Sequence, residues 1–196
     1  MFHSSHRFAA ILCVALAIPR PAFAQTEDAE RHAVTLCALA IPLMHAYVLN
    51  YEYLAAEHHG LAVRLEYAPM IDTAEVDGTE AAGVFNYRYH LSPKMGSLFV
   101  GAYGRYRQVF GKGRAAGVDF DFSVPEVNVG LNVGYRWIVW KGFNAVFSAG
   151  YGYSLTKTRI APDVTATSDA LHAFAKKNAQ FMDAPFYGEF SIGYAF

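Results

Sequence analysis

The sequence predicts an all-β protein: an eight-stranded antiparallel up-and-down transmembrane β-barrel with a short helix in the last extracellular loop. Three observations predict it: an alternating final segment, an N-terminus typical of export, and a series of strands of about ten residues separated by turns. From Phe186 to Phe196 every second residue is aromatic, apolar or glycine, and the residues between are small or polar. Because successive side chains of a strand point to opposite faces, one face of this segment suits lipid and the other suits a polar interior.

The N-terminus has the pattern of a secretory signal peptide. Arg7 precedes an apolar run over residues 8–18, and Ala22-Phe23-Ala24 forms a small-x-small cleavage site. The apolar run is shorter than the roughly 20 residues that a membrane-spanning helix needs. We therefore expect residues 1–24 to be a signal peptide and residues 25–196 to form one outer-membrane β-barrel domain.

The composition agrees with a membrane barrel. The chain has 13 Tyr, 15 Phe and only 17% charged residues, as aromatic girdles and lipid-facing strands require. Without Arg7 and Arg20, 14 basic residues face 17 acidic ones, so no nucleic-acid-binding surface is expected. Removal of Cys13 leaves Cys37 as the only cysteine, which excludes an internal disulfide; we expect Cys37 to pack as a small hydrophobic residue.

The mature chain divides into strands and turns. Eight strands are expected, at about 33–41, 45–55, 60–69, 82–91, 97–108, 123–138, 142–156 and 185–196. The connections at 42–44, 57–60, 92–96 and 141–142 are short, and those at 70–81, 109–122 and 157–184 are longer. Outer-membrane barrels have short periplasmic turns and long extracellular loops. A chain that starts in the periplasm has its second, fourth and sixth connections there, and these three are short.

The last long loop contains a helix signal. Ser168-Asp169 resembles a helix start, and Pro185 follows as a stop. Four residues at helical spacing lie between them: Leu171, Phe174, Ala175 and Asn178. We expect a short amphipathic helix at about 168–181, either packed on the barrel rim as a lid or forming a surface that binds a partner or lipopolysaccharide.

The strands separate apolar from polar side chains. On the second strand, for example, Tyr51 and Tyr53 alternate with Glu52. The first strand gives no orientation, and the fifth alternates less clearly. A lipocalin is also an exported eight-stranded barrel, but with its apolar residues inside. Balanced charges and small residues on the polar face, and Tyr and Phe on the other, favour a polar interior.

The polar face carries eight charged residues: Glu52, Arg64, Glu66, Arg88, Arg105, Glu126, Arg136 and Glu189. Side chains fill the interior of so narrow a barrel, and ions buried there must be paired. We expect a salt-bridge network that plugs the lumen, in which Glu52 faces Arg64 or Arg88. The alternative is a gate that passes small ions.

One pattern suggests catalysis. A His-x-Ser pair such as His90-Leu91-Ser92 resembles the pair in outer-membrane lipid A deacylases, in which a carboxylate orients the His. We expect His90 to face inward and Ser92 to lie at the periplasmic end, away from the outer leaflet, and residues 93–118 contain no acidic residue. The other histidines lack metal-ligand spacing. No enzyme activity, metal or cofactor is expected.

Four segments resemble the DUF3575 family of small outer-membrane barrels: Asn50-Tyr51-Glu52-Tyr53, Phe85-Asn86-Tyr87-Arg88-Tyr89, Phe99-Val100-Gly101-Ala102-Tyr103 and Gly130-Leu131-Asn132-Val133-Gly134-Tyr135-Arg136-Trp137. The resemblance covers most of the mature chain and implies the fold; the family has no established activity. The architecture is also similar to OmpA-type and OmpX-type barrels.

The C-terminal aromatic residues resemble the insertion signal of bacterial outer-membrane proteins. Its expected positions are Phe190, Ile192, Tyr194 and Phe196. We therefore expect the barrel-assembly machinery as a partner during biogenesis, and outer-membrane lipid or lipopolysaccharide afterwards. The expected protein is a monomeric, non-catalytic barrel of the bacterial outer membrane, with a structural role in the envelope or an interaction role of its loops. A narrow ion or solute pore and a lipid A-modifying enzyme are the alternatives.

Overall fold

The computed structural model describes residues 30–37, 40–69, 76–115, 118–139, 142–156, 161–162 and 186–196. Its strands are β1 (His32–Cys37), β2 (Tyr47–Ala56), β3 (His59–Pro69), β4 (Val76–His90), β5 (Leu98–Ala115), β6 (Val118–Val139), β7 (Phe143–Ser154), β8 (Ala161–Pro162) and β9 (Phe186–Ala195). A short helix, α2 (Ala40–Met44), joins β1 to β2.

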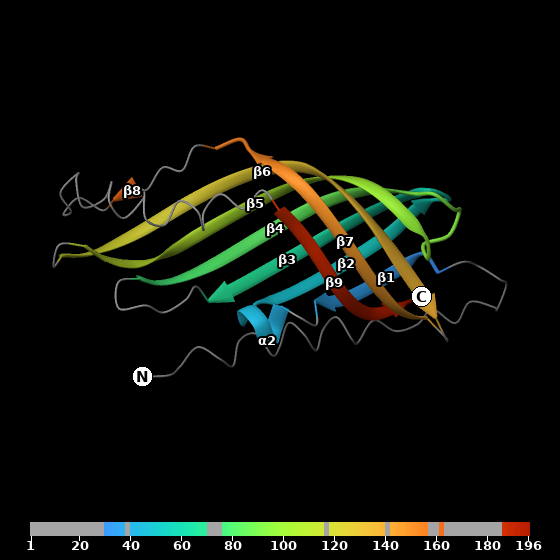
Figure 1. Ribbon diagram of the computed structural model, residues 1–196, viewed down its shortest axis with the longest axis horizontal. Helices are drawn as coiled ribbons and strands as arrows, with labels where there is room; N and C mark the ends of the chain where they lie inside the picture. Colours follow the sequence, from blue (N-terminus) through green and yellow to red (C-terminus); the bar gives the residue numbers. More distant parts are fainter. Residues whose placement is uncertain are drawn as a thin grey trace.

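Eight long antiparallel strands close into an up-and-down barrel, which confirms the predicted all-β class, strand number and topology. The strands follow the order β5-β4-β3-β2-β1-β9-β7-β6, and pairing of β5 with β6 closes the ring (Figure 1). The first and last long strands, β1 and β9, pair directly. The two-residue β8 pairs with β6 at Phe122 and Ser123 and lies outside the ring.

The strands are strongly staggered. A path through paired residues around the barrel leaves β7 at Phe143 and returns to it at Tyr153, ten residues further along. The path passes through Tyr194, Val34, Tyr51, Val63, Phe85, Gly104 and Val129. With ~4.8 Å between strands and ~3.3 Å per residue, this stagger tilts the strands by about 40° from the barrel axis. Eight strands then enclose a space that side chains just fill.

The interior is polar and the outer face is apolar. On β6, Leu131 is 69% exposed, whereas its neighbour Asn132 is 5% exposed. The same alternation runs along β9, where Phe190 is exposed and Glu189 is buried. This distribution excludes the lipocalin alternative, because a lipocalin places its apolar side chains inside.

The structure also orients the two strands whose sequence was ambiguous. On β1, Ala33, Thr35 and Cys37 are buried in the interior. On β5, Phe99 and Tyr103 point inward although both are aromatic. The interior of the barrel therefore contains bulky aromatic side chains as well as ions, and the alternation on β5 is obscured because both of its faces carry large apolar residues.

The prediction for the end of the first strand was wrong. The strand ends at Cys37, not at residue 41, and α2 occupies Ala40–Met44. Pro42 lies within the first turn of this helix, where the backbone N–H has no acceptor within the helix and its loss costs nothing. In a strand that continued through this position, by contrast, the proline could not donate the backbone hydrogen bond that pairs it with its neighbour.

The predicted loops at 70–81 and 109–122 were also too long. Strand β4 already begins at Val76, while β5 continues to Ala115 and β6 begins at Val118. The glycines and charged residues of these segments are typical of loops, but the ladder between adjacent strands is made by the backbone and needs no apolar side chain. The three strands consequently extend well beyond the rest of the barrel (Figure 1).

Other sequence predictions lie outside the described residues. They include the signal peptide at 1–24, the helix at 168–181 and most of the last loop. Within the described part of the chain, no helix is long and apolar enough to cross a membrane.

An apolar plug closes one end of the barrel. Met95, in the connection between β4 and β5, is 1% exposed. It packs against Ala33, Leu54 and Ala195, with Ile138 beside them. These partners lie near the ends of β1, β2, β9 and β6 that surround the C-terminus. The connection therefore folds back to fill this end of the lumen.

Replacing Met95 with Ala should lower the free energy of unfolding by about 2–5 kcal/mol, because a buried side chain of this size leaves a cavity. Urea titration of the refolded protein in detergent measures the effect. The control is Leu91→Ala, which truncates a 54% exposed side chain of the same connection and should cost about 1 kcal/mol or less. Equal losses for the two variants would contradict the plug.

Candidate functional site

The most deeply buried ions gather around one carboxylate. We define the Glu52 cluster as Glu52, Arg88, His90, Arg136 and Glu189. Glu52 Oε2 accepts hydrogen bonds from Arg88 Nη1 at 2.6 Å and from Arg136 Nη2 at 2.5 Å. Arg88 Nη2 donates to Glu189 Oε2 at 2.6 Å. All four side chains are at most 2% exposed. Two arginines thus neutralise two glutamates within the low-dielectric interior.

The Glu52 cluster connects strands that do not pair with one another. Glu52 is on β2, Arg88 on β4, Arg136 on β6 and Glu189 on β9. Neighbouring side chains hold the guanidinium groups in place: Arg136 Nη1 donates to Asn144 Oδ1 at 3.2 Å, and the Arg88 guanidinium lies 4.5 Å from the centre of the Phe99 ring. The charged groups therefore meet across the lumen and tie opposite walls of the barrel together.

A second group of ions lies further along the lumen. We define the Arg105 cluster as Arg64, Glu66, Glu80, Arg105, Arg107 and Glu126. Arg105 Nη2 donates to Glu66 at 2.5 Å and to Glu80 at 2.6 Å. Arg64 pairs with Glu66 at 2.7 Å, and Arg107 pairs with Glu126. With side-chain exposures up to 20%, this cluster is closer to solvent than the Glu52 cluster.

An aromatic layer separates the two clusters. Tyr103 and Tyr187 stack with their ring centres 4.7 Å apart and pack with Val84. On β4, Val84 lies between Arg88 of the Glu52 cluster and Glu80 of the Arg105 cluster. The lumen is thus divided into an apolar plug, a deeply buried ion cluster, an aromatic layer and a less deeply buried ion cluster.

The charges of the two clusters balance. The acidic members are Glu52, Glu66, Glu80, Glu126 and Glu189, and the basic members are Arg64, Arg88, Arg105, Arg107 and Arg136. Five carboxylates thus meet five guanidinium groups among the described residues, with His90 counted as neutral. Pairing offsets the desolvation cost of these buried ions, whereas any one left alone would carry that cost in full.

All eight charged residues that the sequence placed inside the barrel lie in the lumen. Glu52 contacts Arg88, one of its two expected partners, and also Arg136. Arg64, the other expected partner, instead pairs with Glu66 and donates to the Gly188 carbonyl at 3.0 Å. The strand register explains this. Arg64 is opposite Asn50, and Glu52 is opposite Ala62, so Arg64 is displaced from Glu52 along the barrel.

Three members of the network were not among the predicted site residues. Glu80 fell within the predicted loop 70–81, and Arg107 lies at the end of the predicted fifth strand beyond Arg105. His90 was expected to face inward but was not assigned to the charge network. Glu80 and Arg107 each lie two positions from an inward-facing residue. Continuing the alternation of inward and outward side chains by two more residues on each strand would therefore have identified both.

His90 also joins a serine to a carboxylate. Its Nε2 lies 2.8 Å from Glu52 Oε1, and its Nδ1 lies 3.1 Å from Ser97 Oγ. The sequence had pointed to Ser92 and to no acidic partner nearby; the structure supplies Ser97 and Glu52. Ser97 Oγ also donates to the Lys94 carbonyl at 3.0 Å, and His90 is fully buried. This connection fastens the turn after β4 to the ion cluster.

No metal site is evident in the described part of the chain, where no three His, Cys, Asp or Glu residues come together in a suitable group. Cys37 is a buried free cysteine packed with Ala40, Ala46 and Val48.

Neutralising Glu52 should leave Arg136 with no carboxylate partner among those described. We expect Glu52→Gln to lower the free energy of unfolding by about 3–5 kcal/mol. Adding Arg136→Met should restore part of this loss, so that the double variant is more stable than the two single variants predict by addition. Urea unfolding in lipid vesicles measures all three. Glu57→Gln, in the exposed turn after β2, is the matched control and should change stability by less than ~0.5 kcal/mol. Additive losses would contradict the coupling.

Comparison with known proteins identifies one family. The model of the family described as "Protein of unknown function (DUF3575)" matches residues 14–179. Searches of curated proteins and of solved structures returned no match. The matched region includes β1 to β7 and therefore all members of the two clusters except Glu189. The chain belongs to the DUF3575 family.

Proposed function

We propose that the protein is a non-catalytic β-barrel of the bacterial outer membrane, with a structural role in the envelope or an interaction role of its outer end. The observation that carries the proposal is the inverted distribution of side chains. Ions are buried in the lumen, while large apolar side chains cover the outside of every long strand. Such an outer face is stable against hydrocarbon and unfavourable against water.

Many of the exposed aromatic residues lie in two girdles, one near each end of the apolar band. The first surrounds the end that carries the C-terminus and contains Tyr53, Tyr89, Tyr135, Trp137, Tyr194 and Phe196. The second lies towards the opposite end and contains Tyr47, Tyr106, Tyr151, Tyr153 and Phe186. Between them the exposed residues are aliphatic, such as Leu65, Leu131 and Val133, or aromatic, such as Phe85, Phe147 and Phe190. Aromatic rings favour the membrane–water interface and aliphatic chains favour the hydrocarbon, so this order matches one bilayer.

The height of the apolar band supports the same conclusion. Phe143 and Tyr153 lie at the two ends of the exposed face of β7 and are ten residues apart. Ten residues extend roughly 33 Å along a strand, and a tilt of about 40° reduces this to about 25 Å along the barrel axis. The apolar band of outer-membrane barrels is about 25 Å tall.

The contents of the lumen favour a closed, non-catalytic barrel over the alternatives. A pore needs a continuous path, but the Met95 plug and the Tyr103–Tyr187 layer fill successive levels of the interior. An acyl-transfer enzyme needs a serine that reaches its substrate, whereas Ser97 is 6% exposed. The Ser97 hydroxyl lies within hydrogen-bond distance of the Lys94 and Leu98 carbonyls as well as of His90 Nδ1, so these carbonyls compete with His90 for its proton.

The interaction role is assigned to the end that extends beyond the second girdle. From Tyr106, β5 continues for nine residues to Ala115, paired throughout with β6. This hairpin is exposed at Lys112 and Asp121 and projects from the barrel (Figure 1). A rigid paired hairpin offers a partner a defined surface with little ordering cost.

Fractionation and electrophoresis test the membrane assignment. The protein should be recovered with outer membranes and should migrate differently on SDS gels before and after boiling, because a closed barrel resists detergent until heated. In planar bilayers the purified protein should give no steady conductance. Recovery from the soluble periplasm without a heat shift would refute the proposal, and stable ion channels would favour the pore.

Phe196→Asp should reduce assembly in cells far more than it weakens the folded barrel. Phe196 resembles the residue that ends an insertion signal, and its backbone exchanges hydrogen bonds with His32 at 2.8 and 2.9 Å across the β1–β9 seam. In vitro the variant should keep its fold, with a loss of less than about 2 kcal/mol, because the exposed ring lies near the expected interface.

Surface levels in cells, measured beside urea unfolding of refolded protein, separate the two effects. The matched control is Phe186→Asp, at the other end of the same strand, where an exposed aromatic residue is replaced outside the expected signal. Normal surface levels of the Phe196→Asp protein, or an equal assembly defect in the control, would contradict the prediction.

A further inference from the structure

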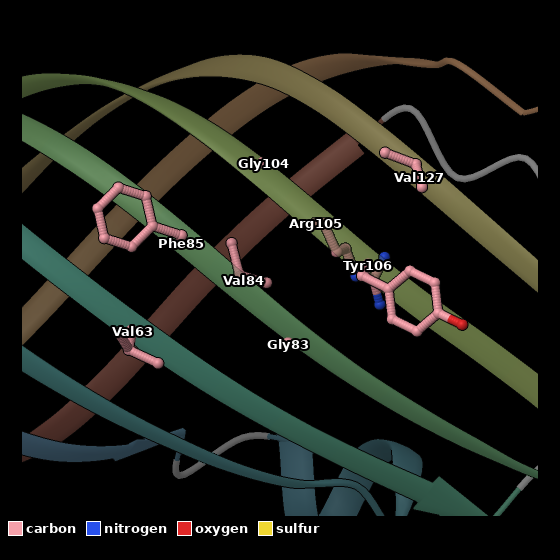
Figure 2. Close-up of a pocket in the computed structure, with 8 residues that line it drawn as sticks. All are labelled: Val63, Gly83, Val84, Phe85, Gly104, Arg105, Tyr106 and Val127. Atoms are coloured by element: carbon pink, nitrogen blue, oxygen red, sulfur yellow. The ribbon is translucent and has the colours of Figure 1, made fainter.

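An apolar groove of about 440 Å³ lies on the outer face of the barrel, across β3, β4, β5 and β6. Its sides are formed by Val63, Phe85, Tyr106 and Val127, and the backbone at Gly83 and Gly104 forms its floor (Figure 2). Because the groove lies just below Tyr106 of the second girdle, it would face the hydrocarbon of the outer half of the membrane.

The floor of the groove is open at both glycines. Gly83 pairs with Tyr106, and Gly104 pairs with Phe85. An aromatic side chain opposite a glycine in a sheet often folds over it. Here the two rings lie on opposite sides of the glycine pair (Figure 2), and no heavy atom lies within 4 Å of where a Cβ would stand at either glycine. The barrel itself therefore leaves this surface uncovered.

Hydrogen-bonding groups continue from the upper end of the groove. The Tyr106 hydroxyl donates to Gln108 Oε1 at 3.4 Å, and Gln108 Nε2 donates to Ser123 Oγ at 3.1 Å. Two outward positions beyond Gln108, after the exposed Phe110, exposed Lys112 pairs across the strands with Asp121. Apart from Phe110, the outer face thus changes along the barrel from apolar to neutral and hydrogen-bonding, and then to charged.

We propose that this surface binds an acylated, phosphorylated sugar lipid of the lipopolysaccharide type, with one acyl chain in the groove and the sugar against Tyr106, Gln108 and Ser123. An apolar groove in contact with hydrocarbon is filled by a chain, since a void would forfeit dispersion contacts. Neutral hydroxyl and amide groups suit sugar hydroxyls, and Lys112 suits a phosphate. The site rests on the proposed membrane location and names the partner of that outer face.

Filling the groove tests the site without disturbing the fold. Gly83→Leu and Gly104→Leu each add a side chain where nothing lies within 4 Å, and Gly188→Leu does the same on β9, away from the groove. Gly83→Ala and Gly104→Ala are milder versions. Each protein is refolded in mild detergent, checked for the heat shift on SDS gels, and incubated with hexa-acylated lipid A or with palmitoyl-oleoyl phosphatidylethanolamine. Native mass spectrometry then counts the retained lipid.

The wild type and Gly188→Leu should retain lipid A in preference to the phospholipid. The two groove leucines should lower lipid A retention by about tenfold, as expected for the loss of one chain contact, with a smaller loss for the alanines. Gln108→Ala combined with Ser123→Ala should weaken retention of lipid A while leaving that of the phospholipid unchanged.

Equal lipid A retention by wild type and the groove leucines would overturn the site, and equal or better retention of the phospholipid by wild type would overturn the sugar-lipid assignment. These outcomes differ from failure of the membrane proposal, in which the wild type itself would show no heat shift. If a leucine variant does not refold, the corresponding alanine variant decides: undiminished retention there also contradicts the site.

Discussion

The balance of charge inside a closed barrel is the constraint on which the rest of the structure depends. An isolated ion in so enclosed a space would be strongly destabilising, and here each carboxylate of the two clusters meets a guanidinium group. Above the Glu52 cluster lies the Tyr103–Tyr187 layer, and below it lies the Met95 plug. These apolar layers keep water away from the Glu52 cluster. The electrostatic attraction within each of its ion pairs is therefore stronger than in water, and the loss of one partner is more destabilising.

The outer face follows from the same arrangement. Within the closed ring, strand pairing satisfies the backbone groups on both sides of each strand, so the outside needs no polar side chain to complete its hydrogen bonding. The polar residues point inward because the period of a strand is two, and their neighbours are left to form a continuous apolar band. The groove at Gly83 and Gly104 interrupts this band, and its position directly below hydrogen-bonding side chains is what distinguishes it from ordinary lipid-facing surface.

Much of the candidate site could be predicted from alternation, since Glu52 and Arg136 each lie between two exposed aromatic residues and Glu189 lies beside exposed Phe190. The prediction missed two residues of the network where the alternation of apolar and polar side chains becomes weak. Glu80 and Arg107 lie on extensions of β4 and β5, near glycines and charged residues that are typical of loops. In these extensions the backbones of β4 and β5 stay paired although the strands have no apolar face. The local amino-acid composition therefore does not show where the strands end.

The sequence by itself determined the fold class, the number of long strands and the face on which each strongly alternating residue lies, because these depend only on the two-residue period and on the spacing of turns. The tertiary structure alone decided which ions meet. Arg88 on β4 reaches Glu189 on β9, although three strands separate them in the sheet. Such a contact depends on the ten-residue stagger around the closed barrel, a property of all eight strands together that no single strand encodes.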